Sequence, residues 1–472
     1  MPVAATGPAS ARQQSLWLEQ ALAGASSFCP PLHGERRADV AIIGGGYVGL
    51  WTAMELKQRE PALDVIILEQ DICGSGASGR NGGYVLSWWT KAPSMRMLWG
   101  DEIARELILK SETAIDDLDV FCRQENIDAE FTRSGWVWGG VSKAHAGSWS
   151  GAVQACRQLG VGDFQELDRE AAAQLAGTDK FISAILDSTA AMLHPGKLVR
   201  GMRAAALRRG IAIYEHSRVN RFTRQNPVRL DTATGTVTAA AVVVATNAWA
   251  AAMPELSRSI VVVASDMIAS RPVTDRLKRL DWLNRAGVND SQQMVNYVRT
   301  TADGRVLAGK GGLASAYGGR ISDRLFYAPG RARIVQKNFA ELYPAFANVE
   351  IEHAWSGPVD RSADGLPMLG CLPGHENIVY GIGWSGNGVG PSRIGGRILA
   401  SLVLREKNEW SSLPIVREQP GRDLPMEPVR YLGGHLVRAA VAMKDRAETR
   451  DRKPGFITQK IASLAPKGVE DR

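Results

Sequence analysis

Apolar runs and a helical pattern alternate in the first part of the chain. Residues 40–43 (Val-Ala-Ile-Ile) are apolar and lead into a glycine-rich turn, after which apolar side chains recur at helical spacing between Leu50 and Leu56. A second, mainly apolar run spans residues 64–69. This order of strand, helix and strand predicts a β-α-β unit.

Strand patterns return in the second half of the chain. Residues 210–222 alternate between apolar and polar positions, residues 241–249 contain an apolar run, and residues 259–270 and 293–312 break into short strands. Residues 375–404 read as a strand, a glycine-rich turn and an apolar helix. We therefore expect strands in both halves of the chain.

Length and composition limit the class of protein. The chain has 472 residues, more than the roughly 250–300 at which one core stops growing, so we expect at least two domains.

Five scattered cysteines without a C-x-x-C pair argue against a disulfide framework and a metal site, and predict a reducing, cytoplasmic setting. We find no signal peptide, and Gly235 and Asn247 interrupt the longest uncharged stretch, residues 232–253, so we expect a buried strand there rather than a transmembrane segment.

The formal net charge is +7, which raises the question of an anionic partner. The arginines are spread along the chain, and we find no basic run with interleaved aromatic residues. We therefore expect no nucleic acid as partner, and a positive field that draws in anionic substrates.

The glycines of the first turn have a meaningful spacing. Gly44, Gly46 and Gly49 fit the pattern G-x-G-x-x-G: the first permits a tight turn, the second lets the backbone approach a pyrophosphate, and the third allows close packing of helix on strand. The helix start offers N–H groups to phosphates. Glu69 ends the second strand, where a carboxylate can bind ribose hydroxyls. These features predict a bound dinucleotide.

A loop of small residues, GSGASGRNGG, follows from Gly74 to Gly83. Such a loop can lie flat against a bulky ring and offer backbone N–H groups together with the side chains of Ser78, Arg80 and Asn81. These properties suit a flavin.

Four motifs in chain order carry a family resemblance: GGGYVGL, GSGASGRNGG, AVVVATNAW and GIGWSGNGVG. Together they resemble the D-amino-acid-oxidase superfamily of FAD enzymes, which includes sarcosine, glycine and γ-glutamylputrescine oxidases, over about residues 15–405. The segments SLWLEQAL, GPVDRSADGLPMLG and EPVRYLGGHLVRAAV most resemble a branch described as aminophosphonate oxidoreductases.

The resemblance implies an α/β (α+β) fold, in which a Rossmann-type FAD-binding domain is interleaved with a substrate domain built on a mixed β-sheet. We expect an N-terminal arm at 1–37 and a C-terminal extension at 409–472 with a basic helical stretch at 432–452. We interpret the extension as surface packing, with an oligomer contact or a membrane-surface helix as alternatives. The expected FAD-binding segments are 38–90, 191–255 and 353–408, and the expected substrate segments are 91–190 and 256–352.

The resemblance also implies that FAD is bound without a covalent link, because the position of the tethering cysteine of sarcosine oxidases falls on Gly357. The helix N-terminus expected at 386–389 can stabilise the negative charge of a reduced flavin. The residues expected to bind the cofactor are Gly44, Gly46, Tyr47, Val48, Gly49, Glu69, Gln70, Ala77, Ser78, Arg80, Asn81, Gly82, Gly83, Val219, Ala245, Thr246, Trp249, Asp364, Gly383, Trp384, Ser385, Gly386, Asn387, Gly388 and Val389.

The arginine that holds the substrate carboxylate in glycine and D-amino-acid oxidases falls on Val359, which offers no donor. A simple α-amino acid is therefore disfavoured, unless Arg361 or another basic residue replaces that arginine. For an anionic substrate group the candidates are Arg80, Lys310 and Arg361, and Trp88, Trp136 and Trp384 are candidates for the pocket wall. Lys310 and Trp384 are the candidate catalytic residues. Lys310 lies close to where some family oxidases place a lysine that assists the reaction with O2; the alternatives are that it binds an anionic substrate group or is a solvated lysine at a strand end.

The implied reaction is oxidation of the C–N bond of a small amine. A hydride passes to flavin N5, the imine is hydrolysed to an aldehyde plus an amine or ammonia, and O2 is reduced to H2O2 or another acceptor takes the electrons. The leading substrate is 2-aminoethylphosphonate or its N-methyl derivative. The alternatives are a γ-glutamylputrescine- or sarcosine-type oxidase or dehydrogenase and a non-catalytic flavoprotein, and the oligomeric state stays open.

Overall fold

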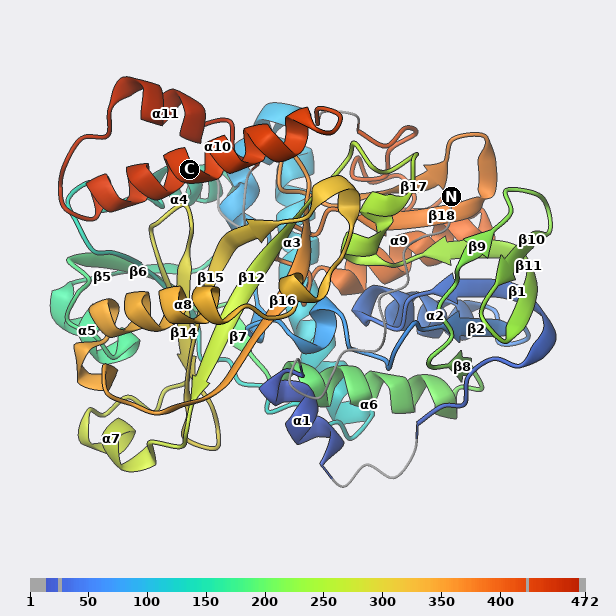
Figure 1. The fold of residues 1–472 in the computed structure, drawn as a ribbon, viewed down its shortest axis with the longest axis horizontal. Helices are drawn as coiled ribbons and strands as arrows, with labels where there is room; N and C mark the ends of the chain where they lie inside the picture. Colours follow the sequence, from blue (N-terminus) through green and yellow to red (C-terminus); the bar gives the residue numbers. More distant parts are fainter. Residues whose placement is uncertain (1–13, 24–27, 422–423, 467–472) are drawn as a thin grey trace.

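The computed structural model describes residues 14–23, 28–421 and 424–466 and contains two eight-stranded sheets (Figure 1). The first sheet has the order β17-β18-β11-β1-β2-β8; β10 also pairs with β11, and β9 pairs with β10. Its strands are β1 (Gly34–Ile43), β2 (Val65–Leu68), β8 (Ala212–Tyr214), β9 (Arg221–Phe222), β10 (Val228–Asp231), β11 (Gly235–Val244), β17 (Met368–Leu372) and β18 (His375–Ile382).

The centre of the first sheet is parallel. β1 pairs in parallel with both β2 and β11, and β11 pairs in parallel with β18. Parallel strands are joined by crossovers and are buried on both faces, and β2 is buried along its whole length. α2 (Tyr47–Arg59) connects β1 to β2 and packs against α9 (Ser392–Leu404). The β-α-β unit expected from the apolar pattern is thus confirmed.

The second sheet is mixed, with the order β16-β12-β15-β14-β13-β4-β6-β5. Its strands are β4 (Trp136–Gly140), β5 (Phe164–Leu167), β6 (Ser183–Asp187), β12 (Val261–Ser270), β13 (Gly287–Asp290), β14 (Asn296–Thr300), β15 (Val306–Ser315) and β16 (Ile351–Arg361). Most of its pairs are antiparallel, and β13 pairs with β4 in parallel. A short pair, β3 (Tyr84–Val85) with β7 (Ala191–Met192), stands apart. The expected fold class, with a Rossmann-type sheet and an interleaved mixed sheet, is confirmed.

One expected boundary differs from the strand pairing. The third segment of the nucleotide domain was expected to begin at residue 353, but β16 runs from Ile351 to Arg361 and pairs with β12 of the second sheet. The chain returns to the first sheet only at β17. The polarity pattern could not locate this point, because most residues of β16 are at least half-buried and do not alternate.

Helices cover both sheets and the outer edge of the molecule. Besides α2 and α9, the described helices are α1 (Leu16–Leu22), α3 (Ala92–Gln124), α4 (Ser150–Leu159), α5 (Arg169–Ala176), α6 (Pro195–Arg208), α7 (Thr274–Arg279), α8 (Pro329–Leu342), α10 (Val429–Glu448) and α11 (Phe456–Ala462). α10 corresponds to the basic helical stretch expected at 432–452, and α10 and α11 lie together along one edge (Figure 1). In the described parts of the chain, no helix is both long enough and apolar enough to span a membrane. The outer ends of the expected arm and extension, 1–13 and 467–472, lie outside the described residues.

Candidate active site

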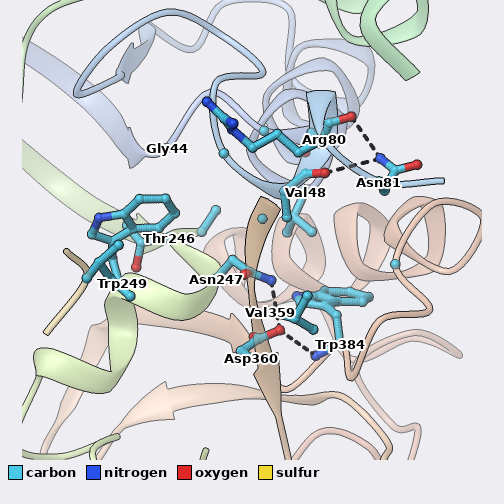
Figure 2. A pocket seen from close by; sticks show the side chains of 18 of the residues that line it. Gly44, Val48, Arg80, Asn81, Thr246, Asn247, Trp249, Val359, Asp360 and Trp384 are labelled. Atoms are coloured by element: carbon cyan, nitrogen blue, oxygen red, sulfur yellow. Dashed lines mark hydrogen bonds between the residues drawn. The ribbon is translucent and has the colours of Figure 1, made fainter. Parts of the chain in front are cut away.

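A cavity of about 960 Å³ is lined by residues of both sheets (Figure 2). The first sheet contributes Ile43, Leu68 and Val244, at the carboxyl ends of three neighbouring parallel strands. In open α/β sheets this edge is where ligands bind. The cavity volume is at the upper end of the range for small-molecule and cofactor sites.

The glycine turn between β1 and α2 forms one wall. Gly44 has a φ of +112°, and a Cβ there would lie 2.5 Å from the Ala245 carbonyl oxygen. A Cβ on Gly46 would lie 2.9 Å from Ser78 Oγ, and one on Gly49 would lie 2.0 Å from the Gly44 carbonyl oxygen. Gly44 and Gly49 therefore require glycine, whereas a side chain at Gly46 would force the Ser78 side chain to move. Gly44, Gly46, Tyr47 and Val48 line the cavity, whereas Gly49 lies outside it and serves the packing of helix on strand.

Glu69 follows β2 and lines the cavity with Gln70. Its carboxylate accepts hydrogen bonds from the backbone N–H groups of Gly45, at 2.7 Å, and Asp71, at 3.0 Å. Burial raises the pKa of Glu69 to about 7, and these two hydrogen bonds oppose the shift. The carboxylate is thus fixed beside the glycine turn, where a ribose would meet it.

The small-residue loop forms the next part of the wall. Ala77, Ser78, Arg80, Asn81 and Gly82 line the cavity, together with Gly74 and Gly76. The Asn81 amide donates to the carbonyls of Ala77 and Ser78 and accepts from Gly83 N–H, so it also holds the loop in shape. Gly83 lies outside the cavity, and a Cβ there would be 2.2 Å from the Leu193 carbonyl oxygen.

Arg80 is buried, and its guanidinium is engaged with the protein. Its Nε donates to the Ser75 carbonyl at 2.7 Å and its Nη1 to the Ser356 carbonyl at 3.3 Å, and the guanidinium lies 4.9 Å from the centre of the Phe326 ring. Burial lowers the pKa of Arg80 to about 10. Arg80 therefore links the small-residue loop to β16.

Val219 lies at another part of the cavity, beside Arg218, Asn220, Arg221 and Phe222. The segment after β11 lines the cavity through Ala245, Thr246, Asn247 and Trp249. From these two segments the sequence had indicated only Val219, Ala245, Thr246 and Trp249.

The turn after β18 brings Trp384, Ser385, Gly386, Gly388 and Val389 to the cavity. Gly383 and Asn387 do not line it: Gly383 N–H donates to Asp360, and the Asn387 amide donates to the Ser87 carbonyl. We expected a helix N-terminus at 386–389, and this expectation is corrected by the structure, because α9 begins at Ser392. The backbone at 386–389 is a turn that precedes the helix.

Asp360 is a cavity residue that the sequence did not indicate. Its carboxylate accepts hydrogen bonds from Gly383 N–H at 2.6 Å, Trp384 N–H at 3.2 Å and the Asn247 amide at 2.8 Å, as Figure 2 shows for the last two. Burial raises the pKa of Asp360 to about 7. Asp364, which was expected to bind the cofactor, lies outside the cavity and pairs with Arg417 at 2.7 Å.

The second sheet supplies the remaining wall. Gly357, Val359 and Arg361 of β16 line the cavity at alternate positions, together with Ser265 of β12 and Tyr297 of β14. Tyr297 Oη and Ser265 Oγ share a hydrogen bond of 2.9 Å. Tyr297 and Ser265 lie in strands that the sequence predicted, but the pattern did not reveal which strand face meets the cavity.

Three of the residues expected at the substrate site, Lys310, Trp88 and Trp136, do not line the cavity. The Lys310 ammonium donates to the Met294 carbonyl at 2.7 Å, to Asn296 Oδ1 at 3.0 Å and to Gln292 Oε1 at 3.1 Å, and burial lowers its pKa. Trp88 and Trp136 are buried in the core, where the rings of Trp136 and Trp138 stack. Lys310 is thus neither a solvated strand end nor a wall residue, and the two tryptophans contribute to packing.

The chain's own residues fit FAD. The glycine turn leaves space that a Cβ would fill, and a buried carboxylate stands beside it. The cavity continues past the small-residue loop to the turn before α9. A dinucleotide requires close backbone approach at its pyrophosphate and a carboxylate at its ribose, and both features are present.

Comparison with known proteins agrees with this geometry. The chain is 28% identical over 421 residues to gamma-glutamylputrescine oxidoreductase of Escherichia coli, covering 88% of this chain and 93% of that protein. It is 27% identical over 398 residues to glycine oxidase of Geobacillus kaustophilus, covering 80% and 96%. The crystal structure of that glycine oxidase superimposes with a TM-score of 0.69 at 24% identity, over 83% of this chain and 100% of the other. Residues 39–402, more than half of the chain, match the family model "FAD dependent oxidoreductase", and the chain therefore belongs to this DAO family.

Proposed function

We propose that this FAD-dependent oxidoreductase oxidises the C–N bond of a small amine that carries an anionic group, and that Arg361 binds this group. The observation that carries the proposal is the arrangement of β16. Gly357, Val359 and Arg361 all line the cavity, because alternate residues of a strand face the same side. The strand thus offers an apolar surface followed by a cation.

The other basic candidates are less suited to this role. Lys310 does not line the cavity, and its ammonium donates to three oxygens away from the wall. Arg80 lines the cavity within the small-residue loop that we expect to hold the flavin, and it links that loop to β16. A guanidinium can bind a carboxylate or phosphonate through two parallel N–H groups. Among the candidates selected from the sequence, Arg361 is favoured by its place, because it lines the cavity on the same strand as Gly357 and Val359.

FAD, when bound, supplies the acceptor for a hydride from the carbon beside the amine nitrogen. The chain's contribution is to bind and orient the amine. Burial raises the pKa of Tyr297 above its usual range, so its hydroxyl stays protonated at the cavity wall. Val359 and Trp384 contribute apolar surface to the cavity wall.

The leading substrate is 2-aminoethylphosphonate or its N-methyl derivative, since the phosphonate matches a guanidinium anchor and the sequence resembles the aminophosphonate branch. γ-Glutamylputrescine or sarcosine is the second candidate, favoured by the 28% identity to the Escherichia coli gamma-glutamylputrescine oxidoreductase. We expect O2 or another electron acceptor as second substrate.

Steady-state kinetics with matched amines test this proposal. We expect 2-aminoethylphosphonate to be oxidised more efficiently than ethanolamine, which lacks the anion. Arg361→Met should raise the KM for the phosphonate about 10- to 100-fold, the range for a charged hydrogen-bonded pair, and Arg361→Lys should restore part of the affinity. Equal oxidation of γ-glutamylputrescine by the wild type and Arg361→Met, with no turnover of the phosphonate, would overturn the proposal.

A further inference from the structure

α10 lies outside residues 39–402, which match the family model, yet it packs against the second sheet (Figure 1). Its inner residues Ala440 and Val441 are buried and pack with Met294 and Leu313. α10 therefore contacts two segments of that sheet, the connection between β13 and β14 and the end of β15.

Asp445 of α10 holds the connection between β13 and β14. Its carboxylate is 3% exposed and accepts hydrogen bonds of 2.9 Å from the backbone N–H groups of Gln293 and Met294. Val295, the next residue, lines the cavity, as does Asn289 at the end of β13. One carboxylate of α10 thus fixes backbone that continues directly into the cavity wall.

Lys310 binds the same connection. Its ammonium donates to the carbonyl of Met294, whose N–H group donates to Asp445. Both backbone polar groups of Met294 are therefore bound by buried charged side chains, one from α10 and one from β15. Such charge-assisted hydrogen bonds are about twice as strong as neutral ones, so they define the path of this connection.

α10 and Glu427, which precedes it, also bind the end of β15 and the segment after β15. Arg438 donates to the Leu313 carbonyl at 2.8 Å, and Glu427, just before α10, accepts a hydrogen bond from Gly318 N–H at 2.9 Å. The cavity-lining glycines of these two stretches are Gly311 and Gly312 in β15 and Gly318 and Gly319 after it. Glycine backbone has wide conformational freedom, so we expect the contacts from Arg438 and Glu427 to restrict it near the cavity.

From these contacts we infer that α10 is a positioning element for the substrate, with Asp445 as its main positioning residue. Asp445 touches no ligand; it fixes residues 293–295 and thereby the wall that Val295 and Asn289 present. Loss of its hydrogen bonds should weaken substrate binding and leave the turn and loop that hold FAD unchanged. The expected change in KM rests on the proposed amine oxidation. The expected change in hydrogen exchange of the connection between β13 and β14 does not.

The test compares substitutions at two acidic residues of the same helix. Asp445→Ala removes the acceptor for both N–H groups, and Asp445→Asn keeps one oxygen. Glu448→Ala is the matched control, because Glu448 pairs with Lys444 and lies near His145, away from the cavity wall. For each FAD-bound protein, the amide hydrogen exchange of residues 288–298 is measured. KM and kcat are measured with whichever of 2-aminoethylphosphonate, its N-methyl form, γ-glutamylputrescine and sarcosine the wild type oxidises.

We expect Asp445→Ala to accelerate exchange at 293–295 at least tenfold and to raise KM at least fivefold, with kcat within about threefold of the wild type. Asp445→Asn should lie between, and Glu448→Ala should change neither quantity. Unchanged exchange, or faster exchange with an unchanged KM, would overturn the inference; if Asp445→Ala does not fold, Asp445→Asn decides by the same criteria. If the wild type oxidises no amine, the proposed function fails, and the exchange data still decide whether α10 orders this wall.

Discussion

The carboxylate of Glu69 accepts a hydrogen bond of 2.7 Å from the backbone N–H of Gly45. This bond joins the end of β2 to the turn that opens α2, so the two features expected to meet a dinucleotide are built as one unit. We therefore expect the loss of this bond to affect cofactor binding.

Glu69→Ala should weaken FAD binding. The change removes the group placed to bind the ribose and leaves the N–H groups of Gly45 and Asp71 without their acceptor. Hydrogen bonds to charged groups contribute about 1.5–3 kcal/mol, so we expect the Kd for FAD to rise about 10- to 100-fold. Titration of the cofactor-free protein with FAD, followed by flavin fluorescence, measures this change, and an unaltered Kd would contradict the assigned role.

Gly49→Ala should destabilise the fold, because the added Cβ would lie 2.0 Å from the Gly44 carbonyl oxygen. Overpacking of this kind costs about 1–3 kcal/mol. Gly434→Ala in α10 is the matched control, since no atom lies within 4 Å of its Cβ, and alanine is favoured over glycine in a helix by about 1 kcal/mol. Thermal unfolding should rank Gly434→Ala at or above the wild type and Gly49→Ala clearly below it; equal melting temperatures for the two variants would contradict the packing argument.

Asp360 predicts a pH dependence of stability. Burial raises its pKa from 3.8 to about 7, so between these values the folded chain binds a proton that the unfolded chain has released. The raised pKa of Asp360 therefore stabilises the folded chain fully below about pH 4. This stabilisation is lost as the pH rises from about 4 through 7, and the free energy of unfolding falls by at most about 1.4 kcal/mol per pH unit.

Asp360→Asn should remove this dependence. Melting temperatures of the wild type and the variant are compared from pH 5 to pH 8, and the wild type should lose stability relative to the variant as the pH increases. A difference between the two proteins that stays constant over this range would show that Asp360 does not titrate there.

Local sequence signals predicted the parts of the site that are local in the chain. The glycine turn, Glu69 and the small-residue loop lie within 40 residues of one another, and their spacing indicated a dinucleotide and a flavin. The cavity contains most of the residues chosen from these motifs.

Contacts between distant segments had no such signal. Trp136 lies in β4, where every residue is buried, so its pattern could not separate a cavity wall from a core. Lys310 lies in β15, whose first six residues are buried without alternation. The bonds of Asp445 join residues about 150 positions apart, and no motif links them. The sequence therefore indicated the cofactor better than the substrate wall.

An anaerobic spectrum of the purified protein, recorded before and after the addition of 2-aminoethylphosphonate, tests the central claim most directly. We predict that the yellow flavin absorbance bleaches; its recovery in air with formation of H2O2 would identify O2 as the acceptor. A yellow protein whose absorbance never bleaches, with this amine, its N-methyl form, γ-glutamylputrescine or sarcosine, would contradict an amine oxidoreductase acting on these substrates and favour a flavoprotein without this activity.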